Sequence, residues 1–437
     1  MKSAFGFLAF FVALSTAIAI AGCGSSSDAS PAAVPDASSN ADAGSSTPDA
    51  DVPDAPIDAI ADAIADVVED IEQDPNVYPA KHHPIPQVDN QGGPILDHMQ
   101  LITVTFTGDA RRDTFRAFGH AIVSTNWWHK TIGSFGAVDG IAGPDAELTA
   151  NAPRTMTDDD FKTYLKAQIV AGNLPTPTPQ SLYVIYAPRS LSISLANLGN
   201  SCQAFYGYHS SFVIALSGGV TVDAAYALVF DCNSGSLPEM TITASHEIAE
   251  AATNPEPFDS PSYVLYTNDA WEQSLGSAGS AGEVGDLCSW MPWTEGSSQV
   301  QRIYSNAAAA ASKNPCQPYD QLYYGAAPRT KTRLVSGIRM DGHVGVTRGQ
   351  SVDVVLDCFS EAALPSDFTL SVGAAGTLRP LGGVTMHLSK NKVHNGNGVV
   401  LTITVAANAT TGDAPFVIRS TLNANDYNDW PVILTVK

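Results

Sequence analysis

The side chains most able to do chemistry gather in one short segment, residues 245–255 (SHEIAEAATNP). His246 and Glu250 are four residues apart, so on a helix they project from one face and can bind one metal ion together. Glu247 lies beside them as a candidate general base. The pattern is the H-E-x-x-H helix of zinc proteases with the second His replaced by Glu. The alternative, a solvated helix whose polar side chains face water, is disfavoured because the segment is otherwise rich in Ala and Ile.

A metal site of this kind needs a third ligand from another segment. The segment 282–288 (GEVGDLC) offers Asp286 as the first choice and Glu283 as the second. Upstream, His209 is either a hydrogen-bonding strand-end histidine or a group that faces the metal or the substrate. Trp271 either lines a cleft and binds substrate or packs against the protein.

The expected chemistry is hydrolysis of a peptide bond by a metal-activated water. His246, Glu250 and Asp286 would hold one divalent metal, and Glu247 would take a proton from the water that attacks the carbonyl. We expect Zn²⁺, but two carboxylates neutralise a dication and acidify its water less than one would. Therefore the activity is slow, or the metal is not zinc, or a cationic group such as His209 compensates.

The N-terminus has the features of an export signal. Lys2 precedes an apolar run over residues 5–20, and Ile20-Ala21-Gly22 leads to Cys23 in the manner of a bacterial lipobox. We expect residues 1–22 to be a lipoprotein signal peptide and Cys23 to carry lipid; the alternative is an ordinary signal peptide with a chance cysteine. Gly24 is not the Asp that retains lipoproteins at the inner membrane, so the outer membrane or the cell surface is favoured.

A tether and a strong acidic bias follow. Residues 23–75 consist mainly of Ala, Asp, Ser and Pro and should be disordered. The whole chain has 22 Lys and Arg against 44 Asp and Glu, and no basic stripe is visible. Nucleic-acid binding is therefore excluded.

The other cysteines fit an oxidising compartment. Four of them pair by sequence proximity as Cys202–Cys232 and Cys288–Cys316, although four cysteines allow three pairings. Cys358 is left as a buried free thiol. A Cys202–His209 nucleophile pair competes with the first disulfide and is disfavoured.

Hydrophobic periodicity divides the remainder into two domains. Over residues 76–332 strands and helices alternate, which predicts a mixed α/β, or α+β, domain. Residues 333–437 contain short strands separated by turns, which predicts an all-β immunoglobulin-like sandwich. The expected strands are 101–106, 182–187, 211–216, 224–230, 351–356, 368–372, 384–388, 399–405, 416–420 and 431–436, and the expected helices are 111–123, 157–169 and 241–253.

An ordered series of motifs resembles a family of secreted bacterial metalloprotease-like proteins. The motifs are 182–188 (LYVIYAP), Cys202, 208–211 (YHSS), 226–232 (YALVFDC), 246–255, 282–288 and 304–306 (YSN) through to Cys316. The family is more distantly similar to the plant phosphate-induced, or Exordium, proteins. The resemblance covers about residues 98–320 and implies a zincin-like domain with His246, Glu247 and Glu250 at its centre. The plant relatives lack a complete helix motif, so the fold alone does not guarantee catalysis.

Two functions from different classes follow. The first is a surface-anchored metal-dependent peptidase, held to the membrane by its N-terminal lipid and acting on extracellular proteins or peptides. The second is a non-catalytic surface lipoprotein for binding or adhesion. In that case Ca²⁺ held by Glu250, Glu283 and Asp286 would stabilise the fold without hydrolysis.

Overall fold

The structure, a computed structural model, describes residues 72–137, 139–149, 155–196, 198–232, 236–265, 270–271, 282–330, 333–335, 338–340, 342–374 and 382–437. The predicted signal peptide, Cys23 and nearly all of the predicted tether lie outside these residues. All described elements belong to the compact unit Asp58–Lys437. Among them, no helix has the length and apolar character that crossing a membrane requires.

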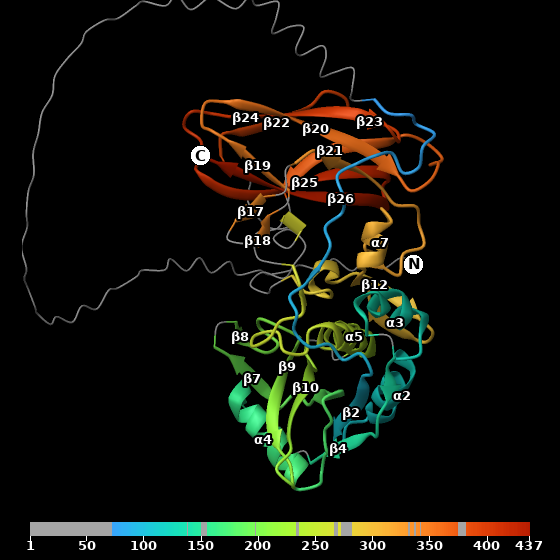
Figure 1. Ribbon diagram of the computed structural model, residues 1–437, viewed down its shortest axis with the longest axis vertical. Coiled ribbons are helices and arrows are strands. Elements are labelled where there is room, and N and C mark those ends of the chain that lie inside the picture. Colours follow the sequence, from blue (N-terminus) through green and yellow to red (C-terminus); the bar gives the residue numbers. More distant parts are fainter. Residues whose placement is uncertain are drawn as a thin grey trace, which may run out of the picture. The chain divides into compact units, whose positions relative to one another are not determined.

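A mixed sheet organises the first part of this unit (Figure 1). Its strand order is β3-β2-β6-β10-β9, with β4 also paired to β2. β2, β6 and β10 run parallel to one another, whereas β9 is antiparallel to β10. Within the described residues β9 pairs with no other strand, so it is the edge strand of this sheet. The bounds are β2 Gln100–Phe106, β3 Ile141–Ala142, β4 Ala146–Leu148, β6 Ser181–Ala187, β9 Gly207–Ala215 and β10 Thr221–Phe230.

Helices cover both faces of this sheet. Successive side chains of β6 point to opposite faces, so Leu182 and Val184 enter one core while Tyr183 and Ile185 enter the other. The first core is covered by α2 (Arg112–Ile122), α3 (Asn126–Thr131) and α5 (Leu237–Thr253), and the second by α4 (Asp158–Val170). Both cores explain why β6 is buried throughout. A 3-10 turn, η1 (Ile132–Phe135), follows α3, and a small sheet of β5 (Thr155–Thr157), β7 (Ser192–Leu195) and β8 (Gly199–Asn200) lies apart from the main one.

Helix α5 is almost completely buried and begins one turn before the predicted start. The Ser236 side chain caps it by accepting a hydrogen bond from the backbone N–H of Glu239, and Pro238 lies in its first turn, where no backbone N–H is needed. Asn254, directly before Pro255, ends it as predicted. Beyond its first turn, each titratable side chain on α5 therefore needs a partner inside the protein.

Short elements and one disulfide organise the chain after α5. They are β11 (Tyr263–Val264), paired with β1 (Asp89–Asn90), the 3-10 turn η2 (Asp286–Cys288), the hairpin β12 (Pro292–Glu295) and β13 (Ser298–Gln301), then β14 (Ile303–Tyr304), α7 (Asn306–Ala310) and β15 (Cys316–Gln317). The Cys288–Cys316 bond holds η2 near β15. Small fixed elements and a disulfide therefore order the described residues of this region.

Both predicted disulfides, Cys202–Cys232 and Cys288–Cys316, are confirmed. Because Cys202 is bonded to Cys232, it has no free thiol and cannot act as a nucleophile. Cys358 is free and buried, as predicted, and burial raises the pKa of its thiol. Two disulfides in one chain are typical of an extracellular or cell-surface protein.

The C-terminal part forms two sheets that pack as a sandwich (Figure 1). One has the order β16-β20-β24-β22 and the other β19-β26-β25-β21-β23. β16 (Tyr324–Pro328) pairs with β20, so the predicted domain boundary at residue 333 falls after the first strand of the sandwich. The other bounds are β17 Arg333–Val335, β18 Ile338–Met340, β19 His343–Val346, β20 Ser351–Ser360, β21 Phe368–Ala374, β22 Val384–Leu388, β23 Lys392–Val393, β24 Gly398–Val405, β25 Gly412–Asn423 and β26 Asp426–Val436.

One buried side chain joins the first described residues to this sandwich. Asn395 Nδ2 donates to the carbonyl oxygens of Pro75 (2.9 Å) and Val77 (2.8 Å). Its Oδ1 accepts from the backbone N–H groups of Ala80 and Ser360, both at 3.0 Å. All four hydrogen-bonding positions of the amide are thus used, which fixes residues 75–80 against β20.

We predict that Asn395→Ala lowers the free energy of unfolding by about 3 kcal/mol, because it leaves several buried backbone groups without partners. Urea denaturation measures the change. Asn425→Ala, in an exposed turn, is the matched control and should change stability by less than about 0.5 kcal/mol. Equal stability of the two variants would contradict this role for Asn395.

Candidate functional site

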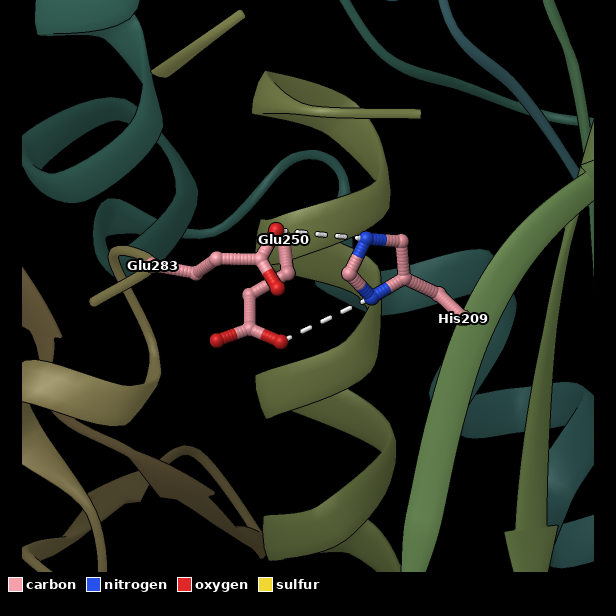
Figure 2. Close-up of side chains that lie close together, drawn as sticks. All are labelled: His209, Glu250 and Glu283. Atoms are coloured by element: carbon pink, nitrogen blue, oxygen red, sulfur yellow. Dashed lines mark ion pairs between the residues drawn. The ribbon is translucent and has the colours of Figure 1, made fainter. Parts of the chain in front are cut away.

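Three segments bring six titratable side chains to one place between α5 and β9. We call this group the His–carboxylate cluster; it consists of His246, Glu247 and Glu250 from α5, His209 from β9, and Glu283 and Asp286 from the segment that leads into η2. Figure 2 shows the carboxyl groups of Glu250 and Glu283 facing the His209 ring, Glu250 at Nδ1 and Glu283 at Nε2. The His246 side chain is 16% exposed and the other five are 4–11% exposed, so His246 is the most exposed member of a largely buried cluster.

Glu250 is the centre of the cluster. Its Oε2 lies 3.1 Å from His246 Nε2 and 3.6 Å from His209 Nδ1. Its Oε1 accepts a hydrogen bond from the backbone N–H of Asp286 at 3.0 Å. The carboxylate is therefore shared between the helix, the edge strand and the η2 segment.

Two overlapping groups of side chains, which share Glu250, could each hold a metal ion, and Asp286 belongs to neither of them. Two sets of donor atoms lie within 4.8 Å of one another: His246, Glu247 and Glu250, and His209, Glu250 and Glu283. Asp286 Oδ1 approaches His246 Nε2 to 3.8 Å. Tetrahedral ligands of a zinc ion are about 3.3–3.6 Å apart, given metal–ligand distances of about 2.0–2.2 Å. The structure thus brings the predicted pair together, with Asp286 on the His246 side and Glu283 on the His209 side.

His209 has one nitrogen fixed by the backbone and the other aimed into the cluster. Nε2 is 3.0 Å from the carbonyl oxygen of Asn254, which can only accept, so Nε2 carries a proton. Nδ1 faces Glu247 Oε2 (3.5 Å) and Glu250 Oε2 (3.6 Å). A lone pair directed at two carboxylates is repelled unless a proton or a cation lies between them. His209 therefore combines the two roles considered for it, since it makes a fixed hydrogen bond and also faces the cluster.

Two amides that support the cluster escaped the sequence prediction. Asn254 Nδ2 donates to Glu283 Oε1 at 2.6 Å, and its Oδ1 accepts from the backbone N–H of Ser262. Gln301 Nε2 lies 2.8 Å from the Gly285 carbonyl oxygen and 2.9 Å from His246 Nδ1. Asn254 belongs to a motif of the sequence analysis without a role assigned to it, whereas no local pattern marks Gln301.

In the neutral His246 ring, the Gln301 N–H donates to Nδ1, which places the ring proton on Nε2 beside Glu250. A metal bound through Nε2 would displace that proton to Nδ1, where it would need an acceptor in place of the Gln301 amide nitrogen. Protons and a metal therefore compete for this face of the ring.

Without a bound metal, burial and the neighbouring charges favour the protonated forms of Glu250, His209 and His246. The pKa of Glu250 is raised from 4.5 to about 8, chiefly by burial; His246 acts to lower it, and Asp286 and Glu283 add to the rise. Burial alone would lower the pKa of both imidazoles. The surrounding carboxylates, chiefly Glu283 for His209 and Glu250 for His246, outweigh burial and hold both pKa values well above the usual range.

Two glycines leave room for the cluster. A Cβ atom at Gly207 would lie 2.5 Å from Glu247 Oε1. At Gly285 it would lie 2.8 Å from Glu250 Oε1 and 2.9 Å from His246 Nδ1. Both distances are too short for non-bonded atoms, so the backbone approaches the carboxylates as closely as it does only because these positions lack side chains.

The prediction that Trp271 binds substrate is wrong. Its side chain is buried, with the residue 3% exposed, and its ring meets that of Tyr304 edge-on at 6.3 Å between centroids. A ring without accessible surface cannot bind substrate, so the packing interpretation holds. Asp269, two residues before Trp271, lies outside the described residues.

Comparisons with known proteins do not identify a family. No protein-family pattern and no curated protein matches the chain. Among solved structures, domains 4 and 5 of the S-layer protein SbsC are similar at 11% identity and a TM-score of 0.18, over 33% of this chain and 61% of that one. A nucleoside hydrolase-related hypothetical protein from Saccharophagus degradans is similar at 10% identity and a TM-score of 0.28, over 78% of this chain and 100% of that one. The periplasmic chaperone SfaE gives 12% identity and a TM-score of 0.18, over 27% and 56%.

We predict that Gly285→Ala weakens zinc binding at least about tenfold and lowers thermal stability, because the new Cβ collides with Glu250 and His246. Isothermal titration with ZnCl₂ and thermal denaturation measure the two effects. Gly373→Ala is the matched control, since a Cβ atom at that position would have no other atom within 4 Å. Zinc affinity unchanged in Gly285→Ala would show that a metal does not use this face of the cluster.

Proposed function

We propose that the chain is an exported, surface-anchored, metal-dependent peptidase. The observation that carries the proposal is the buried cluster in which four carboxyl groups surround two imidazoles. With all four carboxyl groups ionised, His209 protonated and His246 neutral as a ligand, the carboxylates are in excess by three charges. A divalent cation bound among them would offset two of these without the proton that Glu250 otherwise retains.

In the proposed reaction His246, Glu250 and Asp286 would hold the metal, which would supply Lewis-acid activation of the substrate carbonyl and of the attacking water. Glu247 accepts a proton from that water and returns it to the leaving amine. His209, protonated and 3.5 Å from Glu247, supplies positive charge close to the developing oxyanion. This charge offsets the weaker activation expected from a ligand set with two carboxylates.

The edge strand supports a peptide as the substrate. β9 carries His209, and in the described residues it pairs only with β10. An extended peptide can add to such a free edge through main-chain hydrogen bonds, which depend little on its sequence. The peptide would then pass the side of β9 that bears the cluster.

The family resemblance and the N-terminus complete the proposal. A helix with the H-E-x-x-E pattern packed on a mixed sheet is what a zincin-like domain requires, and the two-sheet C-terminal part suits an immunoglobulin-like spacer. The disulfides support export, and the lipobox-like sequence before Cys23 supports attachment to the outer membrane or cell surface.

The second candidate function is a non-catalytic binding or adhesion protein stabilised by Ca²⁺. The carboxylate-rich donor set favours it, because hard cations prefer oxygen ligands. In that case Glu250, Glu283 and Asp286 provide the ligands and the imidazoles serve only as hydrogen-bond donors.

Metal content and hydrolysis of substituted proteins test the proposal. The purified protein should contain one equivalent of zinc, lost in His246→Ala, whereas Glu247→Gln should retain zinc and lose at least about 100-fold in peptide hydrolysis. Asp286→Asn should release zinc and Glu283→Gln should not. Elemental analysis and cleavage of casein provide the measurements, with Glu239→Gln in the first turn of α5 as the control.

Calcium bound in wild type, lost in Glu283→Gln and accompanied by no cleavage, would replace the peptidase by the calcium-stabilised binding protein. Cleavage by Glu247→Gln at the wild-type rate would contradict the assigned mechanism while leaving the metal site in place.

The pH dependence of stability provides a separate prediction. Without metal, folded Glu250 retains a proton between pH 4.5 and about 8 that the unfolded chain loses, and the imidazoles act in the same direction. The unfolded state therefore binds fewer protons, and stability in EDTA should fall as pH rises through this window. Saturating ZnCl₂ should abolish or reverse the slope, because binding displaces those protons. Thermal denaturation from pH 5 to pH 8.5 measures both curves; parallel curves would show that zinc does not bind at Glu250.

A further inference from the structure

An exposed aromatic side chain lies close to His246, the most exposed member of the cluster. Trp290 is 62% exposed, and its backbone adopts a φ of 62°, a conformation that is rare for a bulky residue. Its ring meets Tyr206 at 5.3 Å between centroids and an interplanar angle of 85°. The two perpendicular rings form a corner rather than a flat face.

Hydrogen bonds fix this corner relative to the cluster. The backbone N–H of Trp290 donates to Gln301 Oε1 at 3.3 Å, and the same amide contacts His246 Nδ1 through its Nε2. On the other side, Tyr206 directly precedes Gly207, the glycine against which Glu247 packs. The corner is therefore tied to both the first predicted metal ligand and the general base.

Backbone hydrogen bonds of the next residue, Met291, also fix the position of Trp290. The backbone N–H of Met291 donates to the Cys288 carbonyl, and Arg302 N–H donates to the Met291 carbonyl. Cys288 is in turn fixed by its disulfide to Cys316. A large apolar ring kept at the surface by a rigid, strained turn is a feature of a binding subsite rather than of packing.

We propose that Trp290 and Tyr206 form a subsite that selects substrates with an apolar or aromatic side chain near the scissile bond. The proposal rests on the peptidase function proposed above. β9 begins at Gly207, so a peptide added to this edge passes Tyr206 at the start of the strand. A corner of two rings encloses an aliphatic or aromatic side chain on two sides, whereas a sugar ring would need an open flat face.

The test compares cleavage of internally quenched peptides that differ at a single position, occupied by Phe, Leu, Ala or Asp. Wild type should favour Phe and Leu over Asp at one position by at least about tenfold in kcat/KM. Trp290→Ala should lose most of that preference through a higher KM for the Phe peptide, with kcat for the Ala peptide unchanged. Trp290→Phe should retain most of it. Phe258→Ala, which removes another exposed ring (78% exposed), is the matched control and should behave as wild type.

A measurement without hydrolysis separates this proposal from the peptidase function. Four other tryptophans, at 127, 128, 271 and 430, are buried, and Trp293 is half-buried, so iodide quenching of fluorescence should report mainly Trp290. In Glu247→Gln, the Phe peptide should protect against quenching more strongly than the Asp peptide.

Three results would overturn the subsite. Cleavage in which Trp290→Ala keeps the wild-type preference would reject it while the peptidase function stands. Protection from quenching by soluble xylan or cellulose oligosaccharides but not by peptides would reassign the corner to carbohydrate. No cleavage together with no protection by any peptide would reject both the peptidase function and the subsite.

Discussion

The structure around Glu250 depends on an excess of buried negative charge that must be compensated. Its carboxyl group lies between two imidazoles and close to three other carboxyl groups, and almost none of this surface reaches water. An ionised carboxylate loses much of its hydration in such a place, so protons or a cation have to replace it. Glu250 keeps a proton when no metal is bound, and the same geometry can exchange that proton for a metal. Stability and chemistry are thus linked through one side chain.

The surrounding elements are arranged to permit this concentration of charge. Helix α5 can be buried because its remaining positions are largely small or apolar, and its capping residues satisfy the ends. Gly207 and Gly285 let backbone approach the carboxylates, while Asn254 and Gln301 hold Glu283 and His246 through hydrogen bonds. The disulfide at Cys288 restricts the segment that carries Asp286. Each of these features reduces the freedom of a charged group and hence the reorganisation that metal binding would require.

Local patterns are sufficient to predict the parts of this arrangement that lie within one element. The i, i+4 spacing places His246 and Glu250 on one face of α5, and the spacing of the cysteines suggests both disulfides. The position of His209 requires the packing of β9 against α5, which no local pattern encodes. The role of Gln301 depends on a hairpin packed against the helix. The sequence of β16, YGAAP, does not predict a strand, because it has no β-branched residue and contains Gly and Pro, and its partner β20 comes later in the chain. Trp271 was a candidate for substrate binding because sequence does not reveal burial.

In the proposed peptidase, the short stretch from Glu283 to Trp290 would contribute to both metal binding and selectivity. Asp286 faces the cluster, whereas Trp290 faces solvent four residues later. The amide of Gln301 connects them, since its oxygen accepts from Trp290 and its nitrogen reaches both Gly285 and His246. A displacement of the Trp290 backbone would change the hydrogen bond that Gln301 Oε1 accepts, and with it the amide that contacts His246 Nδ1. In the proposed function the aromatic corner and the metal site would therefore act on one amide, which would couple their occupancies.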